Sequence, residues 1–197
     1  MTSQYLYKDV FELEDIKKPD TILTLLELLA LQLGDEVSIN ELATKLQLSH
    51  DTVERYLYLL EKSFVIFRLR AFSRNLRKEI TKKNKIYFYD IGIRNAILNR
   101  FNKLHLRDDV GALWENFLIV ERKKYLATNE IGARQYFWRT HDQKEIDYIE
   151  DTGEELKAFE FKWKKESAKI PEEFKDTYSN TSFSVVNQSN FLEFCGV

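Results

Sequence analysis

The sequence contains little glycine, proline or cysteine. Six glycines and two prolines among 197 residues amount to about 4% of the chain, against a usual combined share of about 12%. So few of them leave little room for glycine-rich phosphate loops or flexible linkers, and they exclude collagen-like and low-complexity chains. The single cysteine, Cys195, has no second thiol with which to form an internal disulfide or a zinc cluster. These absences favour a reducing, cytoplasmic compartment.

Long apolar runs and the motifs of several common enzyme classes are also missing. The longest apolar stretch, Ile22 to Leu33, is interrupted by polar residues and falls well short of the roughly 20 residues that a bilayer requires. The first residues lack the basic region and apolar run of a secretory signal. The three histidines lie far apart, and the sequence has no Gly-x-Ser-x-Gly elbow. We therefore expect neither a membrane span nor an acyl-transfer hydrolase.

The charge of the chain is nearly balanced overall but strongly uneven along its length. The formal net charge is −2, yet residues 62–85 contain nine basic residues and one acid and therefore carry +8. A concentrated basic band is typical of a phosphate-binding face. The alternative is a solvated pair of strands whose lysines protect an exposed edge. The basic band consists of Lys62, Arg68, Arg70, Arg74, Arg77, Lys78, Lys82, Lys83 and Lys85.

Hydrophobic periodicity and capping residues predict three helices in the first half of the chain. Asp20 is the expected N-cap of the first helix, which Gly34 ends. Ser38 begins the second helix with a Ser-x-x-Glu capping box, and Ser49 begins the third. Two β-rich segments follow at residues 64–69 and 86–89. Three helices and a two-stranded ribbon are typical of a winged helix-turn-helix.

In such a domain the third helix enters the major groove and the ribbon forms the wing. The acids Asp51 and Glu54 weaken phosphate contact from the third helix, so we expect contacts to the DNA backbone more than sequence readout. The alternative is a winged helix that binds a protein and touches no nucleic acid. The candidate groove residues are Ser49, His50, Asp51, Thr52, Arg55 and Tyr56.

The second half of the chain mixes helices and strands and is predicted to have α/β character. A helix is expected over residues 111–127, strands over 135–139, 145–149, 156–163 and 183–186, and a charged helical stretch before the last strand. Arg139, at the end of its strand, is a candidate phosphate contact. Strand alternation favours a core role over base stacking for most of the aromatic residues Tyr136, Phe137, Trp138, Tyr148 and Trp163.

Four polar residues of this half, Glu115, Asp147, Glu160 and Lys162, are predicted to converge. Residues two apart on a strand share a face, so Glu160 and Lys162 lie together. A turn at the Thr-Gly pair between the strands sets Asp147 opposite Ala158 and about 7–8 Å from Glu160. The three carboxylates offer the hard oxygen ligands that Mg²⁺ prefers, and Lys162 can stabilise charge on a phosphate during hydrolysis. The alternative is a solvated strand face with alternating charges.

Several short segments occur in the order found in a known family. YLYKDV near the N-terminus, LEKSFVIFRL, GALWENFLIVE, EIDYI and FEFKW together resemble the C-terminal domain, of unknown function, of bacterial and archaeal AAA-type ATPases. The resemblance implies an α/β (α+β) chain with a segment 1–18 that follows the ATPase module, a winged helix over 19–95, and a restriction-endonuclease-like PD-(D/E)xK mixed-sheet domain over 96–197. It also implies that Glu115 is the helix glutamate, Asp147 the first metal-binding acid, and Glu160 and Lys162 the E-x-K pair.

Two hypotheses follow from these patterns. In the first, the chain is a Mg²⁺-dependent, nuclease-like module that processes DNA. In the second, it is a non-catalytic domain that positions the ATPase on DNA or on a partner protein. No glycine is followed by Lys-Ser or Lys-Thr, so we expect no Walker loop, no nucleotide site and no ATP hydrolysis from this chain. The choice between DNA and RNA stays open, as does the formation of a homo-oligomer.

Overall fold

The computed structural model describes residues 19–73, 84–140, 142–164 and 167–197. Within them it contains seven α-helices, one short 3₁₀ helix and seven strands, which confirms the mixed α+β class. The strands are hydrogen-bonded in the order β1-β3-β2-β4-β5-β6-β7. The chain divides into two compact units: among the described residues, unit 1 contains 19–68 and 84–107, and unit 2 contains 69–73 and 108–197.

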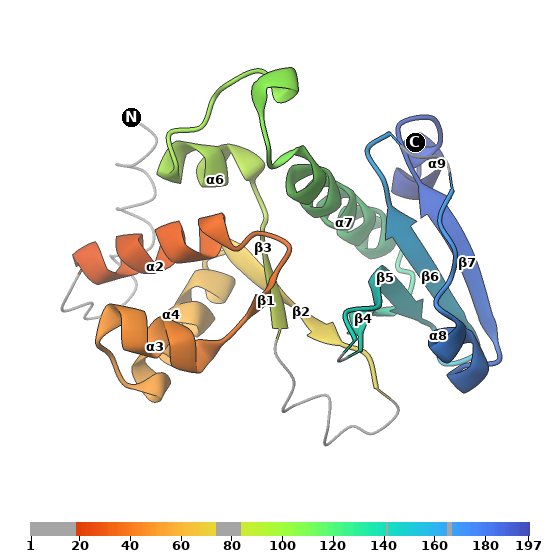
Figure 1. Ribbon diagram of the computed structural model, residues 1–197, viewed down its shortest axis with the longest axis horizontal. Helices are drawn as coiled ribbons and strands as arrows, with labels where there is room; N and C mark the ends of the chain where they lie inside the picture. The colour runs from red at the N-terminus through yellow and green to blue at the C-terminus, as the bar shows by residue number, and fades with distance from the viewer. Residues whose placement is uncertain (1–18, 74–83, 141, 165–166) are drawn as a thin grey trace. The chain divides into compact units, whose positions relative to one another are not determined.

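Unit 1 is mainly helical, and α3 packs against both α2 and α4 (Figure 1). Leu25, Leu42 and Leu57, one from each of these helices, are fully buried, as expected where amphipathic helices bury their apolar stripes against one another. The elements of this unit are α2 (Pro19–Leu31), β1 (Glu36–Val37), α3 (Ile39–Leu46), α4 (His50–Lys62), the first residues of β2 (Ile66–Ala71), β3 (Asn84–Phe88), α6 (Ile91–Ile97) and the 3₁₀ helix η1 (Leu104–Leu106).

Two of the three predicted helix starts are confirmed. The Ser38 and Ser49 hydroxyls each accept a backbone N–H from the residue three positions later, at 3.4 and 3.2 Å, and these caps satisfy donors that have no partner within the helix. Asp20 is not an N-cap, because α2 begins at Pro19 and Asp20 lies in its first turn. Gln47 adopts the left-handed conformation and ends α3, which leaves three residues between α3 and α4.

Both predicted strands of this unit exist with shifted ends. β2 begins at Ile66 rather than at residue 64, because Phe64 has a positive φ of 53° and cannot continue a strand. β3 begins two residues early, because Asn84 and Lys85 pair antiparallel with β1. The predicted domain boundary between residues 95 and 96 falls inside α6. None of the described helices is long and apolar enough to cross a membrane.

Unit 2 is a sheet that carries helices on both faces (Figure 1). The last residues of β2 run parallel to β4 (Arg134–Arg139); β4, β5 (Glu145–Asp151) and β6 (Leu156–Phe161) form an antiparallel meander, and β7 (Thr181–Val186) lies parallel to β6. On one face Phe174 of α8 (Glu172–Thr177) packs in a cluster with Ile149 and Ala158. On the other face lie α7 (Val110–Thr128) and α9 (Phe191–Cys195), where the Phe194 ring lies 4.9 Å from that of Phe159.

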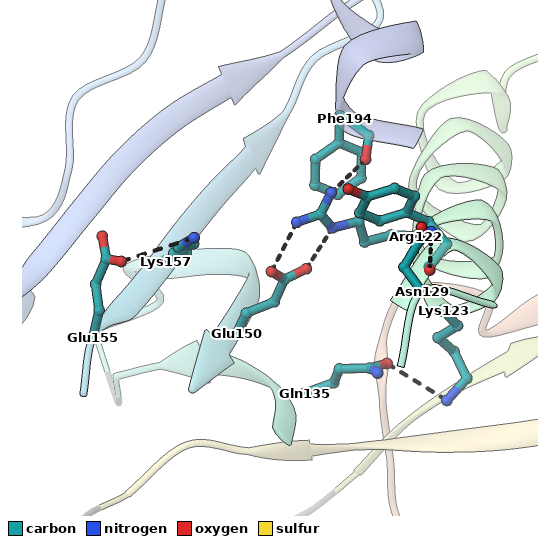
Figure 2. Close-up of polar contacts among 9 residues, drawn as sticks. Arg122, Lys123, Asn129, Gln135, Glu150, Glu155, Lys157 and Phe194 are labelled. Atoms are coloured by element: carbon teal, nitrogen blue, oxygen red, sulfur yellow. Dashed lines mark hydrogen bonds and ion pairs between the residues drawn. The ribbon is translucent and has the colours of Figure 1, made fainter. Parts of the chain in front are cut away.

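A buried ion pair joins α7 and α9 to this second face (Figure 2). Arg122 of α7 donates from Nε and Nη2 to the two carboxylate oxygens of Glu150 in β5, at 2.6 and 3.0 Å. Its Nη1 donates to the Phe194 carbonyl of α9 at 2.8 Å. The side chains of Glu150 and Arg122 are 2% and 13% exposed. Because buried charges are costly unless paired, we interpret this pair as a structural element.

Candidate functional site

Strand β5 carries one extra residue at the position of Asp147. Tyr136 of β4 pairs with Ile149 of β5, and Trp138 pairs with Ile146. From one pair to the next, β4 therefore advances by two residues while β5 advances by three. Ile146 and Ile149 consequently join the same hydrophobic cluster, although strict alternation would send them to opposite faces. Asp147 and Tyr148 form the bulge between them. Bulges re-aim side chains and are common beside functional sites.

Asp147 does not lie opposite Ala158. The prediction that Ala158 opposes Asp147 is wrong, because Ala158 pairs with Ile149 and the hairpin register is shifted by two residues. The last pair of this register joins Tyr148 to Phe159, so Asp147 lies just beyond it, near the end of β6 that carries Glu160. The Asp147 Oδ2 atom also accepts the backbone N–H of Phe161 at 2.7 Å. The Asp147 carboxylate therefore reaches the backbone of the residue that directly follows Glu160.

Lys162 connects the acids of this region. Its Nζ donates to Glu160 Oε1 at 2.5 Å, and the side chains of Lys162 and Glu160 are 33% and 16% exposed. Burial lowers the pKa of Lys162, but the Glu160 hydrogen bond and the charges of Glu160, Asp147 and Glu115 outweigh burial and raise it. All three predicted carboxylates thus act electrostatically on one amine.

Aromatic packing accounts for the position of Glu115. Its neighbour in α7, Trp114, packs edge-to-face on Trp163, which directly follows Lys162, with ring centres 5.1 Å apart. Trp114 also contacts Phe191 of α9 at 5.3 Å. These contacts hold the beginning of α7 against the end of β6. Glu115 and Lys162 are therefore adjacent in sequence to two tryptophans that touch each other.

The donor chemistry of this site fits Mg²⁺, which prefers oxygen ligands. The arrangement is not a closed metal cage, however. Within the described ranges, no three His, Cys, Asp or Glu side chains are grouped so that they could hold a metal ion. Glu160 is engaged by Lys162, and Asp147 by the N–H of Phe161. A metal ion would therefore require at least one carboxylate to turn from its present partner.

Some of the residues predicted to enter a DNA groove have structural roles in α4 or at its start. Ser49 and Thr52 stabilise the start of the helix, with their hydroxyl oxygens 2.8 Å apart. Tyr56 is 4% exposed and belongs to the core, because it lies one turn from Val53 on the buried stripe. Four of the candidates are exposed: Ser49, His50, Asp51 and Arg55.

Parts of the basic band are unsuited to contact a phosphate. The Arg68 guanidinium pairs with Glu54 at 2.8 Å and with Glu61 at 3.0 Å, so its charge is compensated. Lys85 is 1% exposed, and a phosphate cannot reach it. Arg70 of β2 is exposed. Five further members of the band, Arg74, Arg77, Lys78, Lys82 and Lys83, lie outside the described residues.

Arg139 and the strand aromatics are engaged within unit 2. Arg139 donates to Gln143 and lies 3.7 Å from the Glu145 carboxylate, so a phosphate would have to compete with these partners. The core role predicted for the aromatic residues is confirmed where they are buried: Tyr136, Phe137, Trp138 and Tyr148 are at most 8% exposed.

Unit 2 also contains a cavity of about 370 Å³ that the sequence patterns did not predict. It lies at the turn between β5 and β6, at the opposite end of β5 from Asp147. Its lining includes Asp151, Glu154 and Glu155. The acidic stretch EDTGEE around this turn was the one sign of the cavity in the sequence. The aromatic residues of the cavity, Phe72 and Tyr136, come from other parts of the chain.

Comparison with known proteins adds the family of the chain. Residues 1–104 match the family model of a domain of unknown function, DUF8612, and residues 110–194 match that of a second domain of unknown function, DUF4143. The chain is 32% identical over 123 residues to the uncharacterized protein Rv2008c of Mycobacterium tuberculosis and, equally, to the uncharacterized protein Mb2031c of Mycobacterium bovis. Each of these matches covers 61% of this chain and 27% of the relative.

A more distant relative is the uncharacterized protein MJ1637 of Methanocaldococcus jannaschii, 29% identical over 140 residues, which are 66% of this chain and 29% of that protein. The chain thus spans less than a third of the length of these curated relatives. No solved structure matches it. Because the first family model covers more than half of the chain, the protein belongs to the family of the domain of unknown function DUF8612.

Proposed function

We propose that unit 2 hydrolyses phosphodiester bonds with Mg²⁺ in the manner of a PD-(D/E)xK nuclease. The observation that carries this proposal is the Lys162 amine, which hydrogen-bonds Glu160 and is within electrostatic reach of Asp147 and Glu115. Carboxylates attract a divalent cation, and an adjacent amine attracts a phosphate oxygen. The Lys162 amine and the three acids around it can therefore attract both a divalent cation and a phosphate group.

Each residue has a distinct role in this proposal. Asp147, Glu160 and Glu115 would hold Mg²⁺, which when bound lowers the pKa of a coordinated water and offsets phosphate charge. Lys162, whose pKa is raised, is protonated at neutral pH and donates to the phosphate as its negative charge grows. The Phe161 N–H holds one oxygen of Asp147, so that carboxylate is oriented before substrate binds.

We further propose that unit 1 is a winged helix-turn-helix that contacts the DNA backbone. Two capped helices joined by three residues support this assignment, and Arg55 of α4 is an exposed cation on the helix expected to face DNA. The resemblance to the C-terminal domains of AAA-type ATPases, together with the short share of its relatives that the chain covers, supports a role as one module of a longer ATPase-containing protein.

The second candidate function is a non-catalytic domain that positions such an ATPase on DNA or on a protein. It is favoured because both carboxylates already have partners within the protein. Glu160 pairs with Lys162, and Asp147 accepts the N–H of Phe161. A self-compensated cluster of this kind stabilises the end of the sheet without any bound ion.

Cleavage of plasmid and single-stranded DNA by the 197-residue chain with Mg²⁺ separates the two functions. We expect Asp147→Asn and Lys162→Gln each to reduce cleavage by about 10²–10³-fold. Glu172→Gln, which changes an exposed carboxylate of α8, is the matched control and should cleave as wild type does. Cleavage that persists in both site variants contradicts the assigned site. Intact DNA after long incubation with wild type supports the non-catalytic function.

Retention of DNA on the same chain tests unit 1. Affinity should fall steeply as salt increases, and Arg55→Gln should weaken binding to all sequences similarly and reduce the slope of log affinity against log salt by about one. Asp147→Asn should leave retention unchanged or stronger. No retention at low salt would contradict the DNA-binding proposal and direct attention to a protein partner.

A further inference from the structure

The cavity at the β5–β6 turn has a floor that is aromatic and apolar. Phe72, Tyr136 and Leu156 line it, and these residues are 6%, 8% and 9% exposed. The rings of Phe72 and Tyr136 meet edge-to-face with centres 5.3 Å apart. A volume of about 370 Å³ lies at the small end of the range of ligand pockets, so the cavity suits a small ligand or one side chain.

The rim of the cavity is acidic. It includes the carboxylates of Asp151, Glu154 and Glu155 and one cation, Arg134. Arg134 Nη2 donates to Asp151 Oδ2 at 2.7 Å, with the two side chains 63% and 14% exposed. Glu155 lies 3.8 Å from the amine of Lys157 (Figure 2), beyond hydrogen-bond distance. No ion pair of Glu154 is found with any described residue.

The turn that carries these acids is held in place by hydrogen bonds with Asn180 and with the Asp151 side chain. Asn180, which precedes β7, donates from its amide to the Glu154 carbonyl and accepts the N–H of Leu156 at 3.0 Å. Gly153 has a φ of +88°, which suits glycine at this turn, and donates its N–H to Asp151 Oδ1 at 2.8 Å. The rim is therefore preorganised, which reduces the entropy lost on binding.

This cavity is separate from the site around Lys162. Asp147 and Asp151 are four residues apart on β5, which corresponds to about 13 Å along the strand. The residues of the cavity include none of the four that form the candidate hydrolytic site. An aromatic floor offers apolar contact to a hydrocarbon stem, and an acidic rim attracts a positive charge.

We infer that the cavity binds an organic cation, an alkylguanidinium or alkylammonium group, with its apolar stem on Phe72 and Tyr136 and its charged end at Glu154 and Glu155. The partner class is a basic side chain or a small amine, since both present this chemistry. Neutral ligands of the same shape lack the charge that the rim selects, and anions are repelled by it. This inference does not depend on the proposed hydrolytic function.

Titration of the isotope-labelled 197-residue chain with butylguanidinium, monitored by the amide signals of Gly153 and Asn180, tests the inference. We expect saturable shifts with butylguanidinium and butylammonium, and at least about tenfold weaker binding of butylurea, a neutral ligand of matching shape. A lysine- or arginine-containing peptide that binds more tightly than either free cation identifies a side chain as the source. Weaker binding of the peptide identifies a small amine.

Three variants test whether the acidic rim is responsible for binding. Glu154→Gln with Glu155→Gln should weaken butylguanidinium about tenfold, to the level of butylurea, whereas Glu172→Gln with Asp176→Asn, an equal loss of charge on α8, should leave it unchanged. Arg134→Gln should strengthen binding because it frees Asp151 for the ligand. Equal binding of butylguanidinium and butylurea, equal effects of the two double variants, or shifts absent from Gly153 and Asn180 would overturn it.

Discussion

The buried Arg122–Glu150 pair offers a quantitative test of how unit 2 is held together. Glu150→Gln keeps the shape of the side chain but removes the charge that faces Arg122 at 2.6 and 3.0 Å. Because Glu150 is 2% exposed and Arg122 13% exposed, water cannot replace the lost partner. Breaking a buried pair by removing one member costs about 3–5 kcal/mol. Arg122 keeps its hydrogen bond to the Phe194 carbonyl, so we expect Glu150→Gln to lower the free energy of unfolding of unit 2 by about 3 kcal/mol, the low end of that range.

The assay is urea unfolding followed by tryptophan fluorescence, which reports on unit 2 alone because all three tryptophans, Trp114, Trp138 and Trp163, belong to it. The matched control is Glu121→Gln on the same helix, which breaks the more exposed Lys124–Glu121 pair and should cost no more than about 1 kcal/mol. If Glu150→Gln destabilises unit 2 no more than this control does, the pair is not the buried element described here.

Three smaller predictions concern local features of the fold. Gly111→Ala should stabilise unit 2 by about 0.5–1 kcal/mol in the same urea assay, because a Cβ there meets no atom within 4 Å in α7; destabilisation would contradict the open environment. Ser49→Ala should cost unit 1 about 1 kcal/mol in thermal unfolding followed by circular dichroism, because α4 loses its cap; an unchanged transition would refute the cap.

Burial, assisted by the Glu121 carboxylate and opposed by Arg122, raises the pKa of Cys195 from 9.0 to about 11, so at pH 9 iodoacetamide should alkylate native protein at least about tenfold more slowly than urea-unfolded protein. Native protein also binds more protons than unfolded protein between pH 9 and 11, so this thiol should lower stability as pH rises through that window. Equal alkylation rates would contradict the burial of Cys195.

Local signals in the sequence were sufficient for the long elements. The helix at Val110–Thr128 and the start of α4 at Ser49 were predicted to within a residue or two, because periodicity and capping act within a few positions of the chain. Short elements were not predictable in this way. The two residues of β1 have no period, and α9 depends on the packing of Phe194 against Phe159, a contact between residues distant in sequence.

The candidate site was predictable in its residue types but not in its geometry. The charges of Glu160, Asp147 and Glu115 each raise the pKa of Lys162, yet the bulge that carries Asp147 depends on pairing with β4. The sequence offers one local sign of this bulge: Ile146 and Ile149 are three residues apart, whereas apolar residues on one face of a regular strand are two apart.

Tertiary contacts also determine which residues of the basic band are available to a phosphate. Arg68 is neutralised by acids seven and fourteen positions earlier in the chain, and Lys85 is buried on β3. A charge count along the sequence treats both residues as available to a phosphate. Pairing and burial decide which charges remain available, and neither can be read from the order of residues alone.

Manganese titration of the isotope-labelled chain can locate a metal site around Lys162, because this paramagnetic ion broadens amide signals near its binding site and takes the oxygen ligands that Mg²⁺ prefers. We predict that substoichiometric Mn²⁺ broadens the signals of Glu115, Asp147 and Lys162, and that Asp147→Asn abolishes this effect while Glu172→Gln does not. Broadening centred on the acidic turn at Glu154, or none in the wild-type chain, would contradict a metal-dependent site around Lys162.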